Sequence, residues 1–138
     1  MPMLEWNDSL SVNVSKIDDQ HKNLVTMINK LYDMMASNEN SDRSILDIIS
    51  DLHHYAIEHF GTEEEFMEKY NYPEAPSHIN EHKKFSAKVA EVENLCNDGC
   101  TNISMDILNY LSTWLVQHIN ETDKRMGAFI NSQDHNLI

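Results

Sequence analysis

Residues 45–66 read ILDIISDLHHYAIEHFGTEEEF, and this stretch decides the fold class. When its residues are placed at intervals of about 100°, one face gathers apolar side chains within about 40° of His59. That face consists of Ile45, Ile48, Leu52, Tyr55, Glu63 and Phe66. The stretch therefore predicts an amphipathic helix that carries a histidine and a glutamate on its apolar face.

The same pattern recurs around His21, His82 and His118, each of which is accompanied by apolar residues at helical spacing. The breaks between the four stretches are Asn38–Asn40, Tyr70–Pro76 with its two prolines, and Asn97–Gly99. Proline cannot sit in a helix interior, and Asn, Asp and Gly favour turns. The expected helix starts are Asp18 as an N-cap, a position after Ser41 or Asp42, Pro76 or Ser77, and Ile103 or Ser104.

Four such helices joined by short loops predict an all-α fold, an up-down-up-down antiparallel four-helix bundle. The 138 residues fit a single domain. Within it we expect an N-terminal arm (1–17), a bundle over about 18–123 and a short C-terminal helix or tail (124–138). Only three glycines and three prolines occur, which also favours helices over strands.

The chain is strongly acidic, with 10 Lys and Arg against 23 Asp and Glu and a net charge of −13. This charge argues against nucleic acid as a partner, because such binding depends on neutralised phosphates. It also argues against an anionic membrane surface, and no stretch is long and apolar enough for membrane insertion. The first residues show no secretory signal and two cysteines are too few for a disulfide framework, so we expect a cytoplasmic location.

Polar residues on the apolar faces point to a metal site. A single histidine on such a face is usually a core residue with one hydrogen bond, but here all four faces carry one. The inward-facing polar set is His21, His59, Glu63, His78, His82 and His118. Burying these side chains without a common partner would cost about 1–3 kcal/mol each, whereas a bound metal would use their lone pairs.

Spacing and number point to two metal ions. His59 and Glu63, like His78 and His82, are four residues apart and lie on adjacent turns. Five imidazoles exceed the coordination of one tetrahedral zinc ion, so two metals with bridging carboxylates fit better. Imidazole and carboxylate suit Fe, Zn, Cu and Ni, which leaves the metal open. Residues expected in solvent-facing or boundary positions are His53, His54, Glu64, Glu65 and His135.

At these positions the sequence resembles the hemerythrins, specifically the single-domain bacterial hemerythrins. The matching motifs are Ile17–His21 (IDDQH), His59–Glu64 (HFGTEE), Tyr72–Pro73, His78–His82 (HINEH) and Trp114–Ile119 (WLVQHI), together with Asp123 and Trp6. The resemblance spans nearly the whole chain. It departs at Asn13, where the family often has glycine.

The resemblance implies an asymmetric, non-haem di-iron centre. One iron would be bound by His78, His82 and His118, and the other by His21 and His59 with one position left open. Glu63 and Asp123 would bridge the two irons together with an oxo or hydroxo group. The O2 pocket implied by the resemblance consists of Leu24, Phe60, Trp114, Leu115 and Ile119.

One implied ligand conflicts with a regular helix. Asp123 follows His118 by five residues and so would lie about 140° away from it. A π-bulge would bring the Asp123 side chain round to the same side. We therefore predict a helical irregularity between His118 and Asp123.

The resemblance implies reversible binding of dioxygen for carriage, storage or scavenging, and no enzymatic activity. One alternative is an O2- or redox-sensing module that acts with a signalling partner. Another is a di-iron peroxidase or oxidase. Besides O2, the expected partner is an O2-consuming enzyme or a signalling protein, and the favoured oligomeric state is a monomer.

Overall fold

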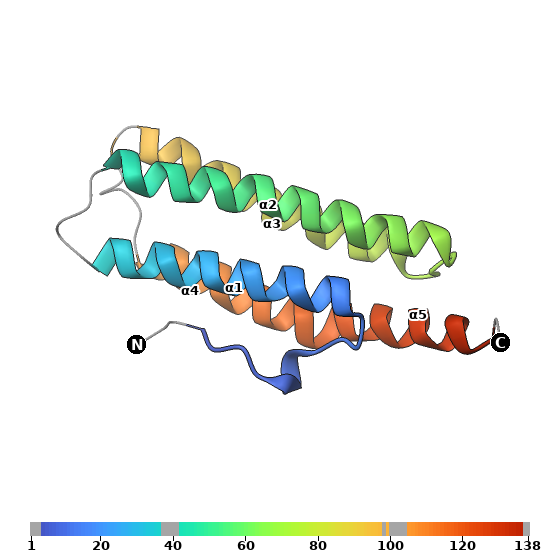
Figure 1. Ribbon diagram of the computed structural model, residues 1–138. Coiled ribbons are helices and arrows are strands. Elements are labelled where there is room, and N and C mark those ends of the chain that lie inside the picture. Colours follow the sequence, from blue (N-terminus) through green and yellow to red (C-terminus); the bar gives the residue numbers. More distant parts are fainter. Residues whose placement is uncertain (1–3, 37–41, 98, 100–104, 137–138) are drawn as a thin grey trace.

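The computed structural model describes residues 4–36, 42–97, 99 and 105–136, and most of them are helical (Figure 1). The elements in chain order are the 3-10 helix η1 (Asp8–Leu10), α1 (Ser15–Ala36), α2 (Asp42–Lys69), α3 (Ala75–Asn97), α4 (Met105–Gln117), the π-helix η3 (His118–Asp123) and α5 (Lys124–Asn136). Helices α1 to α4 run alternately in opposite directions and form an up-down-up-down four-helix bundle. The expected fold class is confirmed.

The four bundle helices surround one interior. α1 contacts α2 and α4, and α3 contacts the same two helices. Fully buried aliphatic side chains such as Ile28, Leu52 and Val89 fill the interior. Because neighbouring helices are antiparallel, the start of α1 lies with the end of α2, the start of α3 and the end of α4 (Figure 1). The histidine motifs all belong to this end of the bundle.

The first helix begins at Ser15, earlier than the sequence pattern predicts, and the N-cap prediction for Asp18 is wrong. Asp18 lies inside the first turn, where its Oδ1 accepts a hydrogen bond from the Val12 backbone N–H at 2.8 Å. Its Oδ2 accepts another from the Ser11 hydroxyl at 2.6 Å. The carboxylate therefore links the N-terminal arm to α1. The prediction failed because the hydrogen-bond donors come from the arm, which the helical periodicity of α1 does not reveal.

The arm also packs closely against α5. Asn13 has a φ of 60°, in the left-handed region that favours glycine and that asparagine tolerates. Its carbonyl accepts a hydrogen bond from the Asn131 side-chain amide at 3.1 Å. A Cβ on Gly127 would lie only 2.3 Å from the Val12 carbonyl oxygen. The backbones of α5 and the arm therefore meet directly, and glycine is required at this contact.

The two-proline break lies between α2 and α3, as the sequence predicts. Asn71 adopts a left-handed φ of 55°, and the Tyr72 N–H donates to the Met67 carbonyl at 2.9 Å. This pattern ends an α-helix in the Schellman manner. Helix α3 begins at Ala75, one residue before Pro76, where a missing N–H costs nothing.

The predicted irregularity near the end of the fourth helix is confirmed, because His118–Asp123 forms a π-helix. Helix α5 follows directly and continues past the start of α1 (Figure 1). The expected break at Asn38–Asn40 and the expected starts at Ile103 or Ser104 lie outside the described residues. Within the described ranges, no helix combines the length and apolar character needed to cross a bilayer.

Candidate metal centre

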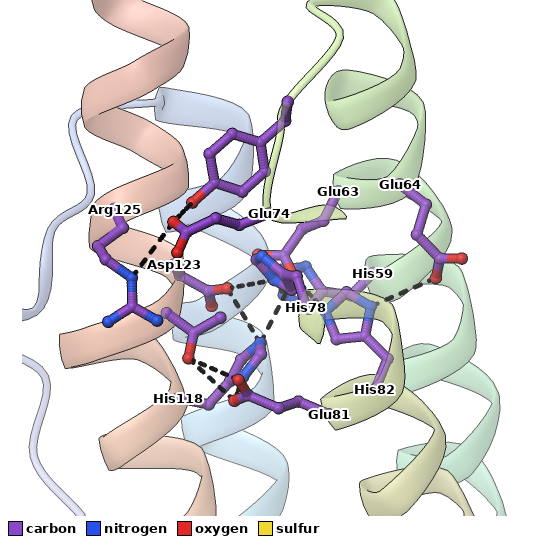
Figure 2. Close-up of polar contacts among 12 residues, drawn as sticks. His59, Glu63, Glu64, Glu74, His78, Glu81, His82, His118, Asp123 and Arg125 are labelled. Carbon is purple, nitrogen blue, oxygen red and sulfur yellow. Dashed lines mark hydrogen bonds and ion pairs between the residues drawn. The ribbon is translucent and has the colours of Figure 1, made fainter. Parts of the chain in front are cut away.

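Seven polar side chains meet inside one end of the bundle, and all of them except His21 are labelled in Figure 2. They come from α1 (His21), α2 (His59 and Glu63), α3 (His78 and His82) and η3 (His118 and Asp123). Each of them is 3% exposed or less. The structure thus brings together all seven residues of the expected ligand set.

Glu63 directs its two oxygens toward different histidines. Oε1 lies 2.8 Å from Nε2 of His82, 3.5 Å from Nε2 of His78 and 3.8 Å from Nε2 of His118. Oε2 lies 3.5 Å from Nε2 of His59 and 3.7 Å from Nε2 of His21. The carboxylate therefore stands between two sets of imidazoles, which we call the three-His group (His78, His82 and His118) and the two-His group (His21 and His59).

The two carboxylate oxygens of Asp123 also face different groups of histidines. Its Oδ1 lies 3.0 Å from Nε2 of both His78 and His118, in the three-His group. Its Oδ2 lies 2.9 Å from Nε2 of His21, in the two-His group. In each group, the imidazoles and the two carboxylates offer ligand atoms that all lie within 4.8 Å of one another. The π-helical turn is what brings Asp123 into this position.

Many of these buried atoms have no hydrogen-bond partner. They are Nε2 of His21, His59, His78 and His118, Oε2 of Glu63, and both carboxylate oxygens of Asp123. Some of these nitrogen and oxygen atoms lie near 3 Å from one another, as His21 Nε2 and Asp123 Oδ2 do, but their relative orientation does not allow a hydrogen bond. A buried polar atom without a partner costs about 1–3 kcal/mol, so such a cluster needs an explanation. Lone pairs that converge from imidazoles and carboxylates fit bound metal cations.

In the metal-free protein, the pKa values of the buried histidines indicate that protons supply the positive charge that metal cations would bring. Burial disfavours a charge on His21 and His78, but Asp123 and Glu63 outweigh it and raise the pKa of each to about 9. The same opposition raises the pKa of His118 to about 11. Burial prevails at His59 and lowers its pKa to about 4. Protons on imidazoles thus offset the buried carboxylates, and metal binding must release them.

The carboxylates respond in the opposite direction. Burial opposes their ionisation, yet the surrounding imidazoles hold the pKa of Glu63 and that of Asp123 well below the usual range. Both side chains are therefore anionic over the whole physiological pH range. Two anions facing two sets of imidazoles form a site for positive charge.

Three imidazoles have outer hydrogen-bond partners. Nδ1 of His59 lies 2.7 Å from Gln20 Oε1, Nδ1 of His118 lies 2.9 Å from Glu81 Oε1, and Nδ1 of His82 lies 3.3 Å from Glu64 Oε2. These oxygens accept the Nδ1–H, which leaves the Nε2 lone pair facing the centre.

Sequence reasoning missed Gln20 and Glu81 as hydrogen-bond partners of the histidines. Glu64, expected on a solvated face, has a half-exposed side chain that also contacts His82. A helical wheel shows which way a side chain points but not which neighbouring helix it meets. One signal was present in the sequence. Gln20 and Glu81 each stand directly before a histidine of the predicted ligand set.

Aromatic rings cover part of the three-His group. Phe60 stacks on His82 with ring centroids 4.0 Å apart, and Trp114 stacks on His118 with centroids 4.5 Å apart. Phe60 also contacts His59 of the two-His group, at 5.7 Å. The other positions expected in the O2 pocket are Leu24, Leu115 and Ile119, and each is at most 1% exposed. Two aromatic rings therefore contact the histidines of the centre, and the three aliphatic side chains are buried in the bundle.

Two of the histidines expected outside the centre lie outside it. His53 pairs through Nδ1 with Glu93, and His54 is exposed to solvent. The side chain of His135 lies outside the described residues.

Comparisons with known proteins agree with this geometry. Residues 12–130 match the family model of the hemerythrin HHE cation-binding domain. The bacteriohemerythrin of Methylococcus capsulatus is 31% identical over 134 residues, which cover 96% of this chain and 100% of that protein. That of Clostridium acetobutylicum is 31% identical over 126 residues, 88% of this chain and 97% of that protein. A crystal structure of wild-type hemerythrin matches with a TM-score of 0.85 and 30% identity, covering 93% of this chain and 98% of the other.

Proposed function

Because the chain belongs to the hemerythrin family, we propose that it binds dioxygen reversibly at a non-haem di-iron centre, for carriage, storage or scavenging of O2. The observation that carries this proposal is that each of the two buried carboxylates faces both groups of histidines. Each of Glu63 and Asp123 directs one oxygen to the three-His group and the other to the two-His group. A carboxylate with this placement suits a bridge between two cations rather than the coordination of one.

We assign the three-His group to one iron, the two-His group to the other, and Glu63 and Asp123 to both. The carboxylates supply two negative charges against two divalent cations, and the five imidazoles are neutral when they coordinate. Two ferrous ions would supply the two electrons that dioxygen takes up when it binds. The smaller number of imidazoles in the two-His group makes that half the place where we expect O2 to enter.

The surrounding side chains support a binding role. Leu24, Leu115 and Ile119 are at most 1% exposed, and as the walls of the proposed O2 pocket they would keep water and protons away from the centre. A diatomic ligand suits a site whose seven polar side chains are each 3% exposed or less. A larger organic substrate would have to displace the core, so this enclosure favours a carrier over an oxidase. The cytoplasmic location and the monomeric state stay predictions.

The test is an anaerobic iron assay followed by optical titration with O2 and removal of O2 by argon. We expect two irons per chain and an absorption change that argon reverses. Irreversible oxidation at the first exposure to O2 would contradict the proposal. Steady turnover with peroxide, or with NADH and a reductase, would favour an enzyme instead.

A further inference from the structure

The outer partners of the imidazoles differ in charge between the two groups of histidines. In the two-His group, the partner of His59 is the neutral amide of Gln20. In the three-His group, the partners of His118 and His82 are the carboxylates of Glu81 and Glu64. The ligand set itself does not require this difference, because any acceptor at Nδ1 would hold the ring.

The neighbouring hydrogen bonds fix the orientation of Gln20. The Thr62 hydroxyl donates to the Glu58 carbonyl at 3.2 Å, so its oxygen can only accept from Gln20. The Gln20 amide nitrogen donates to that oxygen at 3.2 Å. Oε1 of Gln20 is therefore the atom that faces His59, and it accepts the Nδ1–H. The partner of His59 is a neutral acceptor held by two hydrogen bonds.

The carboxylate of Glu81 is held just as firmly. The Thr122 hydroxyl donates to both of its oxygens, at 2.9 and 3.1 Å. His118 Nδ1–H donates to Oε1 at 2.9 Å. Thr122 lies in the π-helical segment, between His118 and Asp123, so the turn that supplies two ligands also secures the outer carboxylate. Glu64 adds a second, longer contact at 3.3 Å on His82.

The remaining imidazoles do not offset this difference. Nδ1 of His21 and Nδ1 of His78 have no hydrogen-bond partner among the residues that the structure describes. The two-His group therefore has one neutral outer partner. The three-His group has two anionic ones.

We propose that Glu81, Glu64 and Gln20 are positioning residues that make the two halves of the centre unequal, so that the three-His half binds its metal first and more tightly. This inference rests on the ligand assignment of the proposed function. A carboxylate that accepts the Nδ1–H draws the proton toward itself and makes Nε2 a stronger donor to the metal. A neutral amide does so less, and it leaves the metal of the two-His half more electron-poor and more ready to take a further ligand.

The test uses zinc, because its binding is read without redox chemistry or O2. Metal-free protein is titrated with Zn(II) in a calorimeter, and the histidine ¹⁵N resonances identify which imidazoles respond to each equivalent. For the wild type we expect two steps, the first of which shifts the resonances of His78, His82 and His118. The second step then shifts those of His21 and His59.

Four variants separate charge from simple packing. In E81Q we expect the affinity of the first step to fall by about 10- to 100-fold, since it keeps the shape of the side chain but removes its charge. E64Q should lower the affinity of the first step by a smaller factor. E81D, which keeps the negative charge, should bind the first zinc ion more tightly than E81Q but less tightly than the wild type. Q20E should raise the affinity of the second step and bring the two steps together. E65Q, which removes the charge of an exposed glutamate next to Glu64, is the matched control and should leave both steps unchanged.

The possible outcomes distinguish this inference from the proposed function. Equal affinities in both halves, or an E81Q titration that matches that of E65Q, would overturn the inference. Two ordered zinc steps in a protein whose iron form takes up no O2 would overturn the proposed function and leave the inference intact. Uptake of a single zinc ion by the wild type would overturn both.

Discussion

His118 Nε2 lies 3.0 Å from Asp123 Oδ1, although Asp123 follows His118 by five residues. A regular helix would direct the two side chains about 140° apart. The π-helical turn His118–Asp123 removes this angle and lets both residues face the same buried centre. The contribution of Asp123 to metal binding therefore depends on one local irregularity.

Replacing Asp123 by alanine should reduce the iron content from two per chain to one or none. The reason is that its carboxylate faces both the three-His and the two-His groups, so its loss weakens both halves. We expect the affinity for Fe(II) to fall by at least about tenfold, measured anaerobically against a chelator. Glu121→Ala, an exposed position in the same turn, is the control. Two tightly bound irons in the Asp123→Ala protein would show that Asp123 is not a ligand.

Replacing Leu115 by alanine should accelerate autoxidation severalfold. Leu115 is 1% exposed, and its truncation would leave a space through which water and protons reach the centre. The rate is measured as the decay of the oxygenated spectrum in air. The truncation should also lower the free energy of unfolding by about 2–5 kcal/mol. Ile57→Ala, at a side chain that is 52% exposed, should change neither quantity appreciably, and equal autoxidation rates in the two variants would argue against a protective role for Leu115.

The same substitution at two glycines should have opposite effects on stability. A Cβ on Gly127 would lie 2.3 Å from the Val12 carbonyl oxygen, so Gly127→Ala must displace the arm and should lower the free energy of unfolding by about 1–3 kcal/mol. A Cβ on Gly61 would meet nothing within 4 Å. Gly61→Ala should therefore raise that free energy by about 0.5–1 kcal/mol, because alanine favours a helix. Urea unfolding measures both, and a loss in both variants would contradict this account of the arm.

The metal-free protein should lose stability as the pH rises from about 6.5 to 9. His21 and His78 have a pKa of about 9 when folded, against 6.5 as the ordinary value, so the folded chain retains protons that the unfolded chain has released. Their stabilisation is complete below pH 6.5 and is lost as the pH rises through 9, and the loss in the free energy of unfolding is of the order of 3 kcal/mol for each of the two histidines.

The zinc-loaded protein provides the control for this pH dependence. A metal requires neutral imidazoles, so zinc should stabilise the protein more as the pH rises through the same interval. Urea unfolding at pH 6.5, 8 and 9 measures both forms. Parallel pH profiles for the metal-free and zinc-loaded proteins would contradict the assignment of these histidines as ligands.

Much of this arrangement could be predicted from the sequence, because helical periodicity reports which residues face inward. His21, His59 and His82 lie on the apolar faces of their helices and meet in the interior as expected. The position of Asp123 could not come from periodicity. It required a resemblance to a known family, and from that the need for a π-bulge followed.

Contacts between elements were not predictable in the same way. Asp18 looks like an N-cap, but its carboxylate receives hydrogen bonds from Ser11 and Val12. Glu81 looks like an ordinary polar residue of α3, but it meets His118 across a helix boundary. The sequence of a single helix does not show which neighbouring helix packs against it, or at which residue along its length. Such partners can therefore be identified only in the assembled bundle.

The extra residue in the π-helical turn also sets the phase of everything that follows it. If His118–Asp123 formed a regular α-helix without the loss of a residue, α5 would be rotated by about 100° about its axis. Gly127 would then turn away from Val12, so the N-terminal arm would lose its close contact with α5. The carboxylate of Asp123 would leave the buried centre at the same time. Insertion of a further residue in this short turn should likewise rotate α5, and it should therefore be far less tolerated than amino-acid replacements at the exposed positions of the turn.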